Sequence, residues 1–331
     1  MKSRPSTGFP GPLFVVGMPR SGTKLLRGLL NEHPRIAIPL NETEFLPHWA
    51  KRWPRWGDLS KREDFSRFYA EVTGSTYFTQ RLLEHGLRVE EETWYRACRD
   101  FSLPSVFEAL VRHDANADLD TVWGDKSPGY LAHLPLLKHL FPTARVVHVI
   151  RDPRDCCLSL KRAYGKSMRR SAYRWQRRVL AARTAAGSFP HDYHELRYED
   201  LLASPASTLR SLCDFLELDF DESMLELSQP TENLGSARGA RMIVKGNAGK
   251  WRTELTSRQI ERVEAAAYPG LIALDYPVSL ATGPRPPGRV SLAALQVLDG
   301  ARLIERDARR VGLPTAVRQR LRLFRETSTS T

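Results

Sequence analysis

The segment 13–30, LFVVGMPRSGTKLLRGLL, combines residue types that can bind an anion. An apolar run ends in a loop containing glycine, arginine, serine, threonine and lysine, and leucines then recur three and four residues apart. This order predicts a strand, a tight loop and a helix. Backbone N–H groups of such a loop and the positive end of the helix dipole converge on one anion, so we expect a phosphate-type ligand here.

The loop departs from the Walker A pattern of ATP- and GTP-binding proteins, GxxxxGK[ST]. Gly17 and Gly22 have the right spacing, but the lysine and the hydroxyl residue that follow come in the reverse order, so the magnesium-binding hydroxyl is misplaced. Ile150 ends a second apolar run and is followed by Arg151 before Asp152, whereas such enzymes place an aspartate for the metal at the strand end. The sequence therefore favours phosphate binding without a metal, and a P-loop kinase or nucleotidase is the alternative.

Five further stretches carry residues suited to chemistry. In chain order they are ETEFLP at 42–47, DKSP at 125–128, RDPRD at 151–155 with Ser159 eight residues after Arg151, RYEDL at 197–201, and KGNAGKW at 245–251. Together with PRSGT at 19–23, they resemble the ordered motifs of the sulfotransferases, which use 3′-phosphoadenosine-5′-phosphosulfate (PAPS). The resemblance covers about residues 13–252.

The resemblance implies a donor site built from the phosphate loop and from later motifs. The loop would cradle the 5′-phosphosulfate, with Arg20 and Lys24 neutralising charge on the bridging oxygen as it leaves. Arg151 and Ser159 match the ligands of the 3′-phosphate. The full implied set for PAPS is Arg20, Ser21, Gly22, Thr23, Lys24, Arg151, Ser159, Tyr198, Lys245, Gly246 and Lys250. Tyr198 would lie near the adenosine, Lys245 and Gly246 in a loop that closes over the 3′-phosphate, and Lys126 and Lys250 near the transferring group.

A hydroxyl acceptor needs a general base. In the tyrosine-sulfating branch of the family the segment after the phosphate loop reads Glu-Thr, three residues, Pro, and its glutamate is the base. Glu42 stands in that position here, with Glu44 in reserve and His33 as a remote alternative, because other branches use histidine. A base of this kind contributes on the order of 10²–10⁴-fold. In-line positioning of donor and acceptor supplies roughly 7–11 kcal/mol, so positioning should outweigh the base.

Two positions depart from the family pattern. Lys24 stands where many members have a second threonine, which could strengthen donor binding or alter the contact to the leaving group. The tyrosine-sulfating branch has an arginine twelve residues after the Arg151 position, where this chain has Ala163 with Lys161 and Arg162 close by. One contact to the 3′-phosphate therefore differs from that branch.

These motifs must be positioned by a sheet. Strand patterns at 13–16, 121–123, 144–150 and 193–196 alternate with helical patterns, which predicts a parallel sheet covered on both faces. Ligands of such sheets lie beyond the carboxyl ends of the strands, where the motifs fall. Asp152 and Pro153 suit the cap and first turn of a helix. We therefore predict an α/β fold: a P-loop-type parallel sheet flanked by helices, as in sulfotransferases, with a helical C-terminal appendage.

Other segments complete the expected layout. We expect long loops over 32–60, helices broken near Gly74, Gly86 and Pro104 over 61–115, and a helix over 130–141 that is interrupted by Pro135. A basic helix over about 168–187 and a helical stretch through Leu218 should follow. The aromatic residues of 45–60 and 61–115 are expected to line an acceptor pocket or to form core. They are Trp49, Trp53, Trp56, Phe65, Phe68, Tyr69, Tyr77 and Trp94.

The C-terminal part has its own composition. The proline-rich stretch 281–290 reads as a linker, which predicts two domains, 1–280 and 281–331. Helical patterns follow at about 291–311 and 314–325, and from residue 281 onward ten arginines face four acidic residues. This basic amphipathic tail leaves peripheral membrane contact and a homodimer open. We favour packing on the chain's own domain or on a second subunit.

Composition narrows the classes further. The formal net charge of +12 over 331 residues and the pI near 9.8 favour an anionic partner. The absence of a recognised DNA- or RNA-binding motif disfavours nucleic acid. Four scattered cysteines predict neither a disulfide framework nor a bound metal. The first twelve residues lack the apolar core of a signal peptide, so a cytoplasmic location is expected.

These observations lead to one functional prediction and two alternatives. We expect a PAPS-dependent sulfotransferase that acts by in-line transfer on a hydroxyl group of a carbohydrate, lipid or small metabolite. Glu42, Arg20 and Lys126 are the expected catalytic residues, and no metal is expected. A P-loop kinase or nucleotidase and a basic membrane-surface binding protein are the alternatives.

Overall fold

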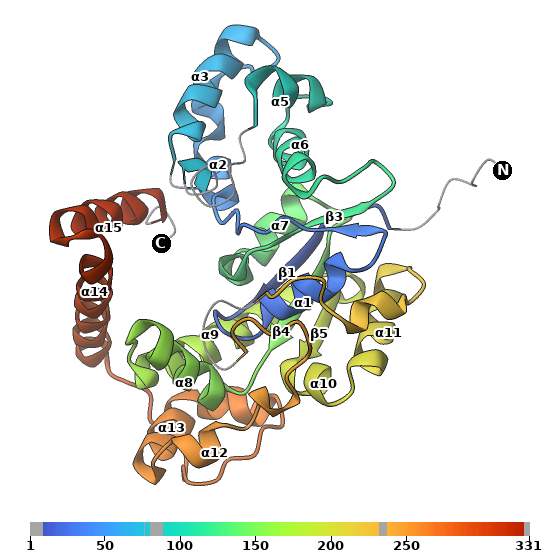
Figure 1. The fold of residues 1–331 in the computed structure, drawn as a ribbon. Coiled ribbons are helices and arrows are strands. Elements are labelled where there is room, and N and C mark those ends of the chain that lie inside the picture. Colours follow the sequence, from blue (N-terminus) through green and yellow to red (C-terminus); the bar gives the residue numbers. More distant parts are fainter. Residues whose placement is uncertain (1–8, 76, 80–88, 232–236, 328–331) are drawn as a thin grey trace.

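The computed structural model describes residues 9–75, 77–79, 89–231 and 237–327 and contains one five-stranded sheet between layers of helices (Figure 1). Every paired strand is parallel to its neighbour, and the order is β2-β3-β1-β4-β5. The strands are β1 (Leu13–Gly17), β2 (Ile36–Ala37), β3 (Val122–Lys126), β4 (Arg145–Ile150) and β5 (Tyr193–Arg197). The first strand therefore lies at the centre, and the loop after it opens at the middle of the carboxyl edge.

The central strand β1 is apolar on both sides, because helices cover both faces of the sheet. Leu13 and Val15 pack with residues of α1 (Thr23–Asn31), α10 (Tyr198–Ala203) and α11 (Pro205–Leu216). Phe14 and Val16 point to the opposite face, as alternation along a strand requires. That face is covered by α6 (Leu103–Ala115), α7 (Leu134–Leu140), α9 (Met168–Ala186) and α13 (Ser257–Ala273). The predicted α/β class, with its helical C-terminal part, is confirmed.

The remaining helices connect or extend this frame. They are α2 (Leu46–Arg52), α3 (Arg62–Thr73), α5 (Glu91–Ala97), α8 (Pro153–Tyr164), α12 (Trp251–Glu254), α14 (Arg289–Val311) and α15 (Leu313–Thr327). Short 3₁₀ turns lie at η1 (Trp53–Trp56), η2 (Pro128–Ala132), η3 (Pro190–Asp192), η4 (Glu222–Leu225) and η5 (Lys245–Asn247). The predicted basic helix and both tail helices are present, and Asp152 caps α8 by accepting from the Arg154 N–H over 2.8 Å.

Two sequence predictions were wrong in detail. The stretch 32–60 is not all loop, because α2 begins at Leu46 and the two residues of β2 pair with Val122 and Trp123 far along the chain. The helix predicted over 130–141 with an interruption at Pro135 is present as η2 and α7, and Pro135 lies in the first turn of α7. The third strand runs on to Lys126, which pairs in register with Val15. Lys126 thus belongs to the sheet edge and not to a loop.

The aromatic residues of 45–107 pack as core. Trp49, Phe68 and Trp94 are at most 4% exposed and lie within ring-contact distance of one another, with centroids 5.2–6.1 Å apart. Edge-to-face arrangements dominate, as expected for buried aromatic clusters. Of the two roles that the sequence allowed for these rings, the structure supports core for the buried ones.

The C-terminal arm of α14 and α15 contacts the turn between α8 and α9 (Figure 1). The Asp299 carboxylate is 3% exposed and accepts from the Ser167 N–H over 2.7 Å, at the cap of α9. Arg302 and Arg306 donate to the carbonyls of Gly165 and Ala163, at the end of α8. The arm is thus fixed to the helices that lead away from the site. Within the described part of the chain, no helix is long and apolar enough to cross a membrane.

A buried carboxylate ties the start of the linker to the sheet domain. Glu264 on α13 is fully buried and accepts backbone N–H groups of Ser279, Leu280 and Ala281 over 2.8–3.2 Å. It also binds Arg154 Nη1 over 2.6 Å. These bonds anchor the chain up to residue 281 to the first turn of α8.

Candidate active site

The loop between β1 and α1 closes tightly at the carboxyl edge of the sheet. The Ser21 N–H donates to the Met18 carbonyl over 3.0 Å, and Arg20 and Gly22 both have positive φ, 73° and 103°. A Cβ at Gly22 would lie 2.2 Å from the Tyr198 ring. Only glycine therefore fits where the loop backbone passes against the start of α10. This geometry leaves the first N–H groups of α1 at the loop.

The predicted donor residues of β1 and β4 meet at this edge. Arg20 Nε donates to Ser159 Oγ over 3.1 Å, although the two residues are far apart in sequence. Arg151 is 6% exposed, and its Nη1 donates to the Arg20 carbonyl over 3.2 Å. The guanidinium carbon of Arg151 also lies 4.4 Å from the centroid of the Tyr198 ring. The parallel neighbours β1, β4 and β5 thus bring together four residues that the sequence grouped only by resemblance.

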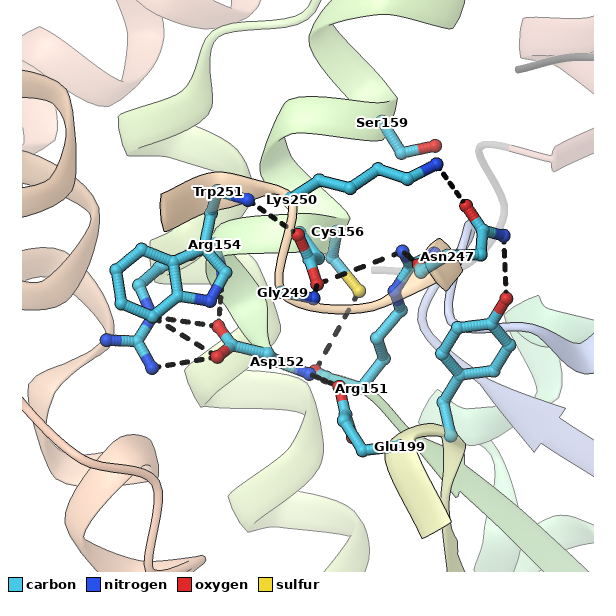
Figure 2. Close-up of polar contacts among 12 residues, drawn as sticks. Arg151, Asp152, Arg154, Cys156, Ser159, Glu199, Asn247, Gly249, Lys250 and Trp251 are labelled. Carbon is cyan, nitrogen blue, oxygen red and sulfur yellow. Dashed lines mark hydrogen bonds and ion pairs between the residues drawn. The ribbon is translucent and has the colours of Figure 1, made fainter. Parts of the chain in front are cut away.

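Asn247 joins several of these residues, as Figure 2 shows. Its carbonyl accepts from Arg151 Nη2 over 2.6 Å, its side-chain oxygen accepts from Lys250 Nζ over 2.7 Å, and its amide donates to Tyr198 OH over 2.8 Å. Sequence reasoning did not single out Asn247. Its place between Lys245 and Lys250 in a glycine-rich stretch was the available signal.

Asp155 holds the 245–251 stretch over α8. Its carboxylate accepts the N–H of Gly249 over 2.6 Å and the N–H of Trp251 over 3.0 Å (Figure 2). Burial raises the pKa of Asp155, while Arg151 and the two N–H donors oppose that rise. Lys245 and Gly246 are exposed, whereas Asn247 of the same stretch bonds to Arg151 and Tyr198. The structure thus brings Lys250, but not Lys245, to the cluster.

The cluster contains buried cations and buried hydrogen-bond donors. Burial lowers the pKa of Lys250, and the nearby Arg151 charge lowers it further. Among the described residues, Ser21 Oγ and Arg151 Nε are buried without a hydrogen-bond partner. Buried donors of this kind are costly unless another group satisfies them. These cations and hydrogen-bond donors therefore fit a ligand with several negatively charged oxygens, such as the phosphate and phosphosulfate groups of PAPS. Within the described chain, no group of acidic, histidine or cysteine residues could hold a metal.

The predicted base lies beside the end of β3. Lys126 is fully buried, and its ammonium donates to the Glu42 carboxylate, whose side chain is 35% exposed. Burial lowers the pKa of Lys126; the charges of Arg27 and Lys24 add to this effect and Glu42 opposes it. Because Lys126 pairs with Val15 in register, this ion pair lies one strand away from the phosphate loop.

Thr43 anchors the segment that carries both candidate carboxylates. It is 3% exposed, and its hydroxyl lies 2.6 Å from Tyr130 OH and 3.4 Å from Ser127 Oγ. Glu44 has a positive φ of 46°, and its carboxylate accepts the Gly129 N–H over 3.2 Å. The side chain is exposed, yet the pKa of its carboxyl is raised, first by desolvation and then by the Glu42 charge. Two carboxylates therefore lie close enough to affect each other.

Asp125 lies beneath this segment. It is 0% exposed, and burial raises its pKa to about 7, although Ser127, Lys126 and Thr43 oppose the rise. Of the four residues of the DKSP motif, only Lys126 was predicted from the sequence to act in the site. Alternate residues of a strand point to opposite faces, so the side chains of Asp125 and Lys126 lie on opposite faces of β3. Of the two, Lys126 contacts the Glu42 carboxylate.

The comparison with known families agrees with the motif order. The sequence profile of the Sulfotransferase family matches residues 12–222, which is more than half of the chain. The chain belongs to the sulfotransferase family. Membership makes a transferase with a hydroxyl-bearing acceptor the general expectation, and it does not favour the kinase or nucleotidase alternative.

Individual relatives are distant. An uncharacterized protein of Aquifex aeolicus is 26% identical over 254 residues, covering 73% of this chain and 30% of that protein. Protein-tyrosine sulfotransferase 1 of Danio rerio is 27% identical over 237 residues, covering 70% of this chain and 59% of that protein. The chain thus corresponds to less than two thirds of either relative. The sulfotransferase domain from the curacin biosynthetic pathway has the same fold, with a TM-score of 0.53, 20% identity, and coverage of 82% of this chain and 100% of that one.

Proposed function

We propose that this chain transfers the sulfuryl group of PAPS to a hydroxyl group of a carbohydrate, lipid or small metabolite. The convergence of Arg20, Arg151 and Ser159 at the carboxyl ends of β1 and β4 carries the proposal. Such a cluster of cations and loop N–H groups suits an anion without a metal. We call this cluster, with Tyr198 and Asn247, the donor side.

The loop and its neighbours would hold the two phosphate-bearing ends of the donor. Residues 20–24 are assigned to the 5′-phosphosulfate, with Arg20 and Lys24 near the bridging oxygen. Arg151, Ser159 and the stretch with Lys245, Gly246 and Lys250 are assigned to the 3′-phosphate. Arg20 bonds to Ser159 across this arrangement, so the two phosphate regions are linked through one guanidinium.

Glu42 is assigned as the general base, because its carboxylate lies beside Lys126 and hence next to the strand that ends in the phosphate loop. When bound, PAPS supplies the sulfuryl group. Glu42 takes the proton from the acceptor hydroxyl as the hydroxyl oxygen bonds to sulfur. Negative charge on the departing phosphate oxygen is stabilised by Lys126, Arg20 and Lys24. Glu44 is the reserve base, and we call the region of Glu42, Glu44 and α9 the acceptor side.

Calorimetric titration with adenosine 3′,5′-bisphosphate, the product left after transfer, tests the donor site. In the presence of a chelator we expect binding, and we expect Arg151→Ala to weaken it by about 10–100-fold, because a charge-assisted hydrogen-bond donor is lost. Arg145→Ala is the matched control. Arg145 begins the same strand at the opposite edge, where it binds Glu217 and the Phe215 carbonyl.

The same titration with ATP separates the alternatives. Magnesium-dependent binding of ATP together with no response to the bisphosphate would overturn the proposal in favour of a nucleotidase. Equal weakening by Arg145→Ala and Arg151→Ala would show that the arginine effect is not local to the donor side.

A further inference from the structure

One face of α9 carries a row of cations that leads away from the candidate base. Arg170, Arg174 and Arg178 are spaced four residues apart, and Lys166 precedes them by the same spacing just before the helix. Residues at this spacing lie on one face, about 6 Å apart along the axis. The buried residues Ser171, Trp175 and Val179 each follow one arginine of the row by one position. The row therefore borders the packed side of α9, and its members are half-buried.

The two ends of the row are fixed by contacts to other elements. At one end, Arg170 binds the Asp299 carboxylate over 3.1 Å, where the C-terminal arm meets α9. At the other end, η2 packs against α9 and its Gly129 N–H binds Glu44, the acid whose charge acts on Arg178. The row thus runs from the acceptor side to the arm.

The two arginines in the middle of the row have no directly bonded partner among the residues that the structure describes: no oxygen accepts a hydrogen bond from Arg174 or Arg178, and neither forms an ion pair. The Asp299 and Glu44 charges act on Arg174 and Arg178 without such a contact. Burial lowers the pKa of Arg174 to about 10, and Arg178 and Arg170 add to the effect. Burial and the charges of Arg174 and Arg170 lower the pKa of Lys166 to about 8. These groups repel one another in a partly desolvated place, an arrangement that an added anion would stabilise.

We propose that Arg174 and Arg178 form a subsite for an anionic group on the acceptor, such as a carboxylate, sulfate or phosphate borne at a distance from the reacting hydroxyl. This inference rests on the proposed function for the position of that hydroxyl, at Glu42. The subsite selects acceptors that carry a negative charge beyond their reactive end. Glu44 interacts electrostatically with both Glu42 and Arg178, so it repels an acceptor anion placed near the base and favours one placed along α9.

Fluorescence titration with two matched aryl alcohols tests the subsite. The probes are 6-hydroxy-2-naphthoate, with its carboxylate at the far end of a rigid ring system from the hydroxyl, and its neutral methyl ester. On protein saturated with adenosine 3′,5′-bisphosphate, we expect the acid to bind at least about tenfold more tightly, because charge-assisted hydrogen bonds form. We expect the preference to shrink as salt is added.

Variants on α9 locate the effect. We expect Arg174→Gln combined with Arg178→Gln to abolish the preference, while Arg177→Gln preserves it. Arg177 lies on the same helix but is exposed, with its guanidinium over the Tyr173 ring. Because the double variant removes uncompensated half-buried charges, its melting temperature should not fall, which separates loss of the subsite from loss of the fold.

The outcomes distinguish the subsite from the donor assignment. Equal affinity for acid and ester, binding of neither probe, or a preference that survives the double variant would overturn the subsite. The titrations are repeated without the bisphosphate. If the bisphosphate itself fails to bind but the double variant still removes a preference for the acid, the donor assignment fails and the anion subsite stands.

Discussion

The donor side and the acceptor side are both basic, but their cations are held in different ways. On the donor side, Arg151 is fixed by the carbonyls of Arg20 and Asn247, and Asn247 in turn holds Lys250. On the acceptor side, no described residue accepts a hydrogen bond from Arg174 or Arg178, and the pKa values of both arginines are lowered. The backbone thus preorganises the donor side, whereas the acceptor side has charge without a built-in partner.

This difference matches what each side is proposed to bind. The sulfuryl donor has a constant structure, so rigid positioning is effective: each cation can be held in place for one oxygen of the donor. An acceptor that varies among relatives is better selected by charge along a helix, where substitutions change specificity without disturbing the sheet edge. The comparison predicts that changes on the two sides separate into effects on donor binding and effects on turnover or acceptor choice.

The largest expected effect comes from the base. Glu42→Gln should lower turnover by roughly 10²–10⁴-fold, while bisphosphate affinity changes little, because the carboxylate lies on the acceptor side. Single-turnover measurements with donor and acceptor, alongside bisphosphate titration, check the split. Glu44→Gln is the matched variant, two residues away on the same segment.

Full activity in Glu42→Gln would remove the assignment. If Glu44→Gln instead showed the loss, the base would be Glu44, whose pKa is raised by desolvation and by the Glu42 charge. Equal moderate losses in both would mean that the two carboxylates act as one coupled pair.

A change in the loop should break the donor side selectively. In Gly22→Ala the new Cβ would lie 2.2 Å from the Tyr198 ring at a φ of 103°, so we expect a loss of about 1–3 kcal/mol of stability. Bisphosphate affinity should also fall, because Tyr198 and the loop shift apart. Thermal unfolding and calorimetry measure the two effects. Gly283→Ala is the control, since a Cβ there meets nothing within 4 Å; unchanged bisphosphate binding in Gly22→Ala would contradict the tight loop geometry.

The last prediction concerns stability and not turnover: Asp125, beneath the acceptor side, should make the stability of the fold depend on pH. Its pKa is about 7 in the folded protein, above the ordinary value, so the native state binds the proton more tightly than the unfolded state. The stability that this group contributes is complete at acid pH and is lost as pH rises from about 4 to 7. Asp125→Asn should flatten that part of the curve of melting temperature against pH.

Exposed Asp120, just before the same strand, supplies the control as Asp120→Asn. Parallel curves for the wild type and Asp125→Asn would show that the buried carboxyl does not hold its proton, and the interpretation of this layer would be wrong.

The sequence predicted the donor side better than the acceptor side for a physical reason. A strand, a glycine-containing loop and a helix N-terminus are contiguous, so 13–30 and the start of α8 at Asp152 could be recognised from local pattern. The ordered motifs also identified the family. By contrast, the two-residue strand β2 and the layer of Thr43 and Tyr130 depend on contacts between distant segments, which no local period encodes.

The row on α9 could not be recognised for a related reason. Arginines at 169, 170, 174, 177, 178 and 183 surround much of the helix, and spacing alone does not say which of them face the acceptor side. Only the packing of Trp175 and Val179 against the core selects 170, 174 and 178. Asn247 was missed because its role depends on bonds to Arg151 and Tyr198, which come from other strands' ends.

The buried carboxylate of Glu264 limits where this chain can be divided for expression or fused to another protein. It binds backbone N–H groups as far as Ala281 and forms an ion pair with Arg154. The Arg154 guanidinium lies 3.7 Å from the centroid of the Trp251 ring. Figure 2 shows these two side chains beside the donor side. Truncation before residue 279 would remove the three backbone N–H donors and leave the buried carboxylate with its Arg154 partner, next to the start of the helix that carries Ser159. A domain boundary placed after Ala281 keeps the bonds of Glu264 to residues 279–281 intact. A boundary a few residues earlier would remove these bonds and so disturb the donor side, although the cut lies outside it.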